Sequence, residues 1–202
     1  MIRQNMVNKL KILAAGDFHG NKDIVRKLSD KAKKEKVDLV ILTGDIYGAL
    51  EGDSKILEPF EKVNKKVVFI PGNWDSKEEH LRLRKRAKSI DNYYVTYKGV
   101  GIAGIGSEDW KMQLHQEDFD SIKRNFERMK TKKKILVSHL HARGTKAEFS
   151  GILGDEILRK AVEEFKPDLL ISSHIHEGEG IEDRIGKTKV IQVGRIGKIL
   201  KI

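Results

Sequence analysis

The chain contains no cysteine, and this absence excludes both disulfide bridges and thiolate metal sites. Any metal ion would therefore be bound by nitrogen and oxygen atoms alone. The sequence also lacks an apolar stretch of the length that crosses a bilayer. Its start, M-I-R-Q-N-M-V-N-K-L-K, lacks the hydrophobic region of a signal peptide. These absences predict a cytoplasmic protein with no membrane partner.

Basic residues outnumber acidic ones, and the formal net charge of the 202 residues is +10. Such a charge could attract nucleic acid. However, the lysines are interspersed with glutamate in runs such as residues 31–36, as is common at solvated helix ends. The basic run 82–88 ends a predicted helix and is expected to be a solvated face that points away from the candidate site. Nucleic acid stays open as a partner but is not favoured.

Apolar, β-branched runs alternate with segments of helical period, which predicts an α/β fold. The pattern favours layers of helix packed on a central sheet. No internal repeat or linker is visible, so a single domain over residues 1–202 is expected. Strands are predicted at residues 11–15, 38–42, 67–70, 93–97, 100–105, 134–137 and 168–172, with two short strands around residues 194–197. Helices are predicted around residues 24–32, 56–63, 76–87, 119–129 and 157–165.

Seven side chains of the kinds that bind metals follow the ends of these strand-like runs. They are Asp17, His19, Asp45, Asn73, His139, His174 and His176. Loops that leave the carboxyl ends of strands converge on one crevice in open α/β sheets. Each residue alone has an ordinary explanation as a turn or cap. Together they are hard to explain as turns, and burying them without partners would be strongly destabilising. The set predicts a site for two divalent cations, which favour chemistry on phosphate.

The ordered motifs D-x-H, G-D, G-N, S-H and S-H-x-H resemble those of the calcineurin-like metallophosphoesterase superfamily, from Asp17 to about Gly194. The resemblance implies a four-layer α/β/β/α sandwich with two mixed central sheets. It also implies that a metal-bridging water attacks phosphorus in line. The implied ligand sets are Asp17, His19, Asp45 and His176 for one metal, and Asp45, Asn73, His139 and His174 for the other. The short chain looks like the small archaeal and bacterial phosphodiesterase branch.

One position departs from the family pattern, because Trp74 follows Asn73 where many members carry histidine. Tryptophan has no titrating proton, so protonation of the leaving group is expected to be the weak step. This favours phosphodiesters or activated monoesters as substrates. His141 is a candidate replacement acid and Arg143 a candidate clamp for a phosphate oxygen. An exposed or supporting role for His141 is the competing explanation.

The predicted function is that of a metal-dependent phosphoric ester hydrolase, with a phosphodiesterase favoured. Its expected cofactors are two divalent metal ions from among Mn, Zn, Fe, Co and Ni, with manganese favoured. The expected partner is a phosphate ester, nucleotides included, and a homodimer stays open. The alternatives are a non-catalytic scaffold of the same fold that binds proteins, and a nuclease drawn to nucleic acid by its positive charge.

Three further features surround these motifs. His80 and His115 do not follow a predicted strand as the candidate ligands do, and they are predicted to lie on the surface. The segment G-I-G-S-E-D-W-K-M-Q, residues 104–113, places glycines beside Trp110. It is interpreted either as a flexible lip over the crevice or as a plain loop with Trp110 packed down.

Overall fold

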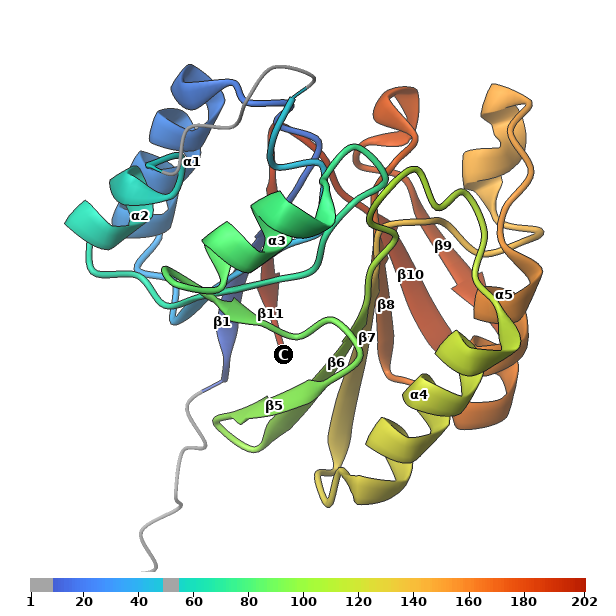
Figure 1. Cartoon of the computed structure of the whole chain (residues 1–202). Helices are drawn as coiled ribbons and strands as arrows, with labels where there is room; N and C mark the ends of the chain where they lie inside the picture. Colours follow the sequence, from blue (N-terminus) through green and yellow to red (C-terminus); the bar gives the residue numbers. More distant parts are fainter. Residues whose placement is uncertain (1–8, 49–54) are drawn as a thin grey trace, which may run out of the picture.

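The computed structural model describes residues 9–48 and 55–202 (Figure 1). The first eight residues, which carry most of the expectation about a signal peptide, lie outside the described residues. Two β-sheets face each other in the middle of the molecule, and helices cover both outer faces. No helix among the described residues is long and apolar enough to span a bilayer.

The first sheet has five strands in the order β11-β1-β2-β3-β4. Its strands are β1 (Lys11–Ala15), β2 (Leu39–Leu42), β3 (Val67–Phe69), β4 (Lys88–Ser89) and β11 (Lys198–Lys201). Strands β1 to β4 run parallel, and β11 pairs antiparallel with β1. The four residues of β2, L-V-I-L, are buried on both faces, which explains why this strand is apolar throughout instead of alternating.

The second sheet has six strands in the order β5-β6-β7-β8-β10-β9. Its strands are β5 (Tyr94–Tyr97), β6 (Val100–Ile105), β7 (Lys133–Ser138), β8 (Leu169–Ser172), β9 (Glu182–Ile185) and β10 (Thr188–Gln192). The strands predicted at residues 93–97 and 100–105 form a hairpin, since β5 and β6 pair antiparallel around a turn at Lys98 and Gly99. β9 also pairs antiparallel, whereas β6, β7, β8 and β10 are parallel.

The helices form the two outer layers. They are α1 (Lys22–Lys34), α2 (Glu58–Lys62), α3 (Lys77–Leu83), α4 (Gln116–Arg128) and α5 (Glu156–Phe165), with two 3₁₀ turns, η1 (Lys146–Ser150) and η2 (His176–Gly178). α1, α2 and α3 pack on the first sheet, and α4 and α5 pack on the second. Two helix caps are visible in the sequence: Asn21 accepts from the first turn of α1, and Ser76 and Glu79 form a capping box on α3.

Three apolar clusters define the layers. One lies between the two sheets and includes Ile12 and Ile41 from the first sheet and Ile102 and Ile171 from the second. The other two lie between each sheet and its helices. The expected four-layer sandwich with two mixed sheets is therefore confirmed.

The C-terminal tail joins the two sheets. It contains the two short strands predicted around residues 194–197, but these strands do not pair with each other. β10 lies in the second sheet and β11 in the first, so residues 193–197 cross from one sheet to the other. Sequence reasoning missed β4 and β9. Both are short and polar, and they are strands only because a neighbouring strand offers them hydrogen bonds.

Candidate metal centre

The seven candidate ligands converge from both sheets. Asp17, Asp45 and Asn73 follow β1, β2 and β3 of the first sheet, whereas the histidines at 139, 174 and 176 follow β7 and β8 of the second. Backbone hydrogen bonds join these loops: the Asp17 amide donates to Gly44 O (3.0 Å), and the Ser173 amide donates to His139 O (3.0 Å). The centre therefore lies where the carboxyl ends of the two sheets meet.

Asp17, His19 and His176 form one group whose potential ligand atoms all lie within 4.8 Å of one another. The Nε2 atoms of the two histidines are 3.1 Å apart. Asp17 is buried, and its Oδ2 atom has no hydrogen-bond partner. These atoms can hold one cation.

Asp17, Asp45 and His139 form a second such group. The Asp45 Oδ2 atom lies 3.5 Å from His139 Nε2 and 3.7 Å from His19 Nε2, so this oxygen faces both groups. Asn73 Oδ1 lies 2.8 Å from His139 Nε2. Asp17 belongs to both groups, whereas Asp45 belongs only to the second. The shared role predicted for Asp45 alone therefore extends to Asp17.

His174, the last of the seven candidate ligands, lies beside His139. The two rings lie 5.1 Å apart between centroids and cross at 68°. The His174 amide also donates to Asp17 Oδ1 over 3.3 Å. His174 does not belong to either group of ligand atoms within 4.8 Å among the described residues.

Left-handed backbone conformations turn several of these side chains inward. Positive φ angles occur at Asp17 (58°), His19 (46°), Asp45 (51°) and His174 (76°). For an L-residue this conformation costs roughly 1–2 kcal/mol. Of the glycines that precede the ligands, Gly16, Gly44 and Gly72, only Gly44 has a positive φ (101°). The unfavourable backbone conformation therefore occurs mainly at the ligand residues themselves.

Burial shifts the pKa values at the centre away from the charged forms. It raises the pKa of Asp45 to about 6, and burial together with the Asp45 charge raises the pKa of Asp17 well above its usual value. Burial lowers the pKa of His19 and His139 to about 4 and that of His174 to about 3. The histidines are therefore neutral at pH 7 and free to offer lone pairs.

The hydrogen bonds of His139 show that the donor set fits a cation. Its Nδ1–H donates to Thr43 O over 2.9 Å, which leaves a lone pair on Nε2. That lone pair faces Asn73 Oδ1 at 2.8 Å and the Asp45 carboxylate at 3.5 Å. Acceptor atoms this close, with no proton available at neutral pH, repel one another unless a cation lies among them. Nitrogen and oxygen donors of this kind suit Mn, Zn, Fe, Co or Ni.

Two residues that sequence reasoning missed hold the centre together. The buried carboxylate of Asp75 accepts from the amides of Ile46 and Tyr47 (both 2.9 Å) and from that of Gly72 (2.8 Å). It ties the loop after β2 to the loop after β3. Burial raises its pKa to about 7. The position directly after Trp74 carried no signal of this role.

Arg195 is the second missed residue. It lies on the crossover between β10 and β11, and its Nε donates to Asp17 O over 2.8 Å. A terminal nitrogen of the same guanidinium lies 3.3 Å from His176 Nδ1. No local pattern could have revealed this contact, because it joins residues 178 positions apart.

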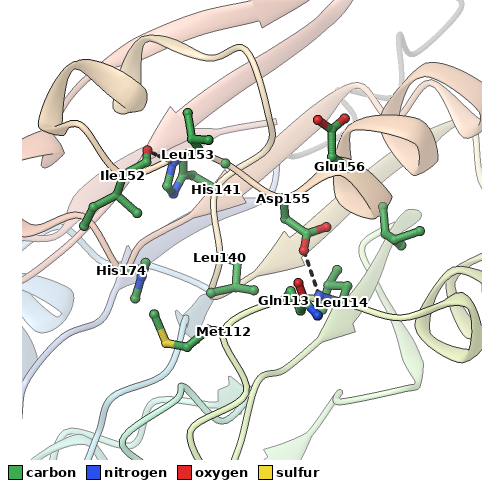
Figure 2. Close-up of a pocket in the computed structure, with 12 residues that line it drawn as sticks. Met112, Gln113, Leu114, Leu140, His141, Ile152, Leu153, Asp155, Glu156 and His174 are labelled. Carbon is green, nitrogen blue, oxygen red and sulfur yellow. Dashed lines mark hydrogen bonds between the residues drawn. The ribbon is translucent and has the colours of Figure 1, made fainter.

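His141 and Arg143 lie beside the centre in different settings. His141 is buried, its Nε2–H donates to Ile152 O (3.2 Å), and its Nδ1 has no partner. Its ring stacks at 20° to that of His174, with centroids 6.4 Å apart. Both rings line a pocket of about 390 Å³ with Met112 and Leu140 (Figure 2). Arg143 instead lies 3.5 Å and 3.6 Å from the Glu148 and Glu156 carboxylates.

The surface prediction for His80 is wrong. The side chain is buried, with Nδ1 2.6 Å from Glu108 Oε2 and Nε2 2.8 Å from Ser89 Oγ. His115 is exposed, as predicted. Of the two interpretations of the segment around Trp110, the one in which Trp110 packs down is wrong, because 63% of its surface is exposed.

Comparisons with known proteins find relatives of the same fold. A model of the calcineurin-like phosphoesterase family matches residues 10–178. The Methanocaldococcus jannaschii protein MJ1162 is 28% identical over 204 residues, which cover 92% of this chain and 88% of that one. Among solved structures, TT1561 of Thermus thermophilus has a TM-score of 0.76 at 15% identity, over 93% of this chain and 91% of that chain. An archaeal phosphodiesterase has a TM-score of 0.55 at 15% identity, over 95% and 99%. Identities this low show a shared fold alone.

Proposed function

The chain belongs to the calcineurin-like phosphoesterase family, and on that premise we propose that it is a binuclear metal-dependent phosphodiesterase. Members of this family depend on two metal ions, and membership supports the activity of a phosphoric ester hydrolase. The diester preference, the pair of metals in this chain and the choice of manganese are parts of the proposal.

One observation carries the proposal. The Asp45 Oδ2 atom lies between two sets of donors, 3.7 Å from His19 Nε2 and 3.5 Å from His139 Nε2. A carboxylate that faces two sets of nitrogen and oxygen donors is what a pair of cations needs. We assign Asp17, His19, Asp45 and His176 to one cation, and Asp45, Asn73, His139 and His174 to the other.

When bound, two divalent cations would neutralise phosphoryl oxygens and lower the pKa of a water molecule. The chain's own residues hold the ligand side chains in position. Thr43 O fixes the ring of His139, and Asp75 keeps the loops of Asp45 and Asn73 together. The Arg195 guanidinium beside Asp17 supplies a permanent positive charge that attracts the phosphate anion.

The leaving group receives little help from the chain, which favours good leaving groups. Trp74 stands at the position of the usual histidine and offers no titrating proton. Burial lowers the pKa of His141, so this residue is neutral at pH 7 and is a poor acid. Its unpaired Nδ1 is better suited to accept a hydrogen bond from the substrate. Arg143 Nε faces the carboxylates of Glu148 and Glu156, which compete with a phosphate oxygen for its positive charge.

The proposal is tested by the hydrolysis of bis- and mono-p-nitrophenyl phosphate with Mn, Zn, Fe, Co and Ni, using the metal-free protein and its Asp45→Asn variant. We expect the diester to be the better substrate, manganese to support activity, and Asp45→Asn to lower kcat/KM at least a hundredfold. The matched control is Asp30→Asn, because Asp30 is an exposed aspartate on α1, and this variant should keep full activity.

The outcomes separate the candidate functions. Inactivity with every metal would contradict the proposal and favour a scaffold that binds proteins. Equal loss of activity in Asp30→Asn would mean that the assay reports stability and not the centre. A nuclease would instead cleave polynucleotides and bind them with a steep salt dependence.

A further inference from the structure

Both tryptophans of the chain lie exposed at the rim of the metal centre. Trp74 has 39% of its surface exposed and Trp110 has 63%. Their ring centroids are 4.6 Å apart at an angle of 56°. Side chains of this size normally contribute to stability by being buried. Leaving both large apolar rings in water next to one site suggests that they serve a ligand.

The two indoles are attached to the backbone that carries the candidate metal ligands. The Trp74 amide donates to Asp45 Oδ1 over 2.9 Å, and the Trp110 amide donates to Asn73 O over 2.9 Å. The Trp74 ring also meets His19 edge to face, with centroids 5.7 Å apart at 89°. His19, Trp74 and Trp110 thus form a continuous aromatic wall that leads outward from the centre.

The loop that carries Trp110 is held firmly at several points. The Ser107 amide donates to Pro71 O (3.1 Å), and the Asp109 amide donates to Asp75 O (3.0 Å). Asp109 also accepts from the Lys77 amide at the start of α3 (3.2 Å). These bonds fix the loop to the segment that follows β3.

The buried His80 adds a further anchor. It joins the Glu108 carboxylate, two residues before Trp110, to Ser89 Oγ on β4. Asp109 and Trp110 have φ angles of 57° and 62°. Two successive left-handed residues, one of them a bulky aromatic, are strained and persist only where the surroundings impose them. The surrounding bonds therefore hold Trp110 in an exposed position at a cost in free energy.

We infer that Trp74 and Trp110 form a stacking platform that binds a planar aromatic ring of the phosphate ester, attached to the phosphate directly or through a ribose. This inference rests on the proposed function, because the phosphate is expected at the metal centre. Aromatic rings stack on tryptophan with little dependence on their identity. The platform selects esters that carry a nucleobase or an aryl group over those that carry a small alkyl group.

The test is equilibrium binding of adenosine monophosphate, phenyl phosphate and methyl phosphate to the manganese-loaded protein, measured by quenching of tryptophan fluorescence and by calorimetry. Adenosine monophosphate should bind at least tenfold more tightly than methyl phosphate. Trp110→Ala should weaken adenosine monophosphate binding about five- to a hundredfold and leave methyl phosphate unchanged. Trp110→Phe should restore most of the affinity. Each single variant keeps one indole as the reporter.

Tyr93→Ala is the matched control, since Tyr93 is an aromatic residue with 51% of its surface exposed that lines a different pocket. It should leave all three affinities unchanged. If phenyl phosphate binds as tightly as adenosine monophosphate, the ring alone is recognised. If it binds more weakly but still more tightly than methyl phosphate, the ribose and base add contacts.

Two results would overturn the inference: equal affinity for adenosine monophosphate and methyl phosphate, or an equal loss of both affinities in Trp110→Ala. Failure of the proposed function has a different signature. In that case no ester is hydrolysed with any metal, while the Trp110-dependent preference for adenosine monophosphate persists.

Discussion

At the scale of single residues, the candidate centre combines strained backbone with buried ionisable side chains. Asp17, His19, Asp45 and His174 have left-handed backbones, and His139 and Asp45 are buried. Strained residues persist where the surrounding structure over-determines them, and such places are often functional. The same residues carry pKa values shifted against their charged forms. Without cations, the centre therefore lowers the stability of the fold.

This cost predicts that Asp45→Asn stabilises the metal-free protein at neutral pH. Burial raises the pKa of Asp45 from 3.8 to about 6. A carboxyl group whose pKa is raised by folding contributes stability below pH 3.8, and that contribution is lost as the pH rises through about 6. Asparagine keeps an oxygen that can accept from the Trp74 amide but carries no charge. The free energy of unfolding should exceed that of the wild type by up to about 3 kcal/mol at pH 7.5.

The measurement is urea unfolding of both proteins in EDTA at pH 4 and at pH 7.5. The difference in unfolding free energy should be small at pH 4 and large at pH 7.5. Adding manganese at pH 7.5 should reverse the order, because cations stabilise only the protein that binds them. A variant that is less stable than the wild type at pH 7.5 in EDTA would contradict this explanation.

At the scale of elements, the loops after β2 and β3 approach each other so closely that only glycine fits between them. A Cβ atom added at Gly44 would lie 2.5 Å from Gly72 N and 2.8 Å from His139 Nδ1. Gly44 also has a φ of 101°. This contact sets the spacing between Asp45 and Asn73, because each directly follows one of the two glycines.

We therefore predict that Gly44→Ala is far more destabilising than Gly99→Ala. Both glycines have a positive φ, but nothing lies within 4 Å of a Cβ atom added at Gly99. Gly99→Ala should cost about 1–2 kcal/mol through backbone strain alone. Gly44→Ala adds steric overlap and should cost about 2–5 kcal/mol. Thermal unfolding and manganese affinity measure the two effects, and equal costs at both positions would contradict the close approach.

How much of this the sequence could predict depends on how local the signal is. The strands that precede Asp17, Asp45 and His139 are apolar runs, and the capping box at Ser76 is a pattern over four residues, so all of these were predictable. The roles of Asp75 and Arg195 were not. Their partners are brought near by the fold, over 29 residues for Asp75 with Ile46 and over 178 for Arg195 with Asp17. The sequence does not encode such contacts in any local pattern.

At the scale of the whole molecule, the centre exists because the two sheets place their strand ends together. The loops of the first sheet supply the two carboxylates, His19 and Asn73. Those of the second supply the other three candidate histidine ligands, His139, His174 and His176. The crossover from β10 to β11 joins the sheets and carries Arg195 to the centre. On the neighbouring strands, Glu182 of β9 pairs with Lys189 of β10 and with Lys198 of β11, so one ion-pair group also spans both sheets.

The central claim is that residues from both sheets jointly bind two cations through a shared carboxylate. The most direct test is anomalous diffraction at the manganese edge from crystals of the manganese-loaded protein. We predict two anomalous peaks per chain, one beside Asp17, His19 and His176 and the other beside Asn73, His139 and His174, with Asp45 touching both. A single peak that leaves either sheet's side chains without metal, or no peak at these strand ends, would contradict the account.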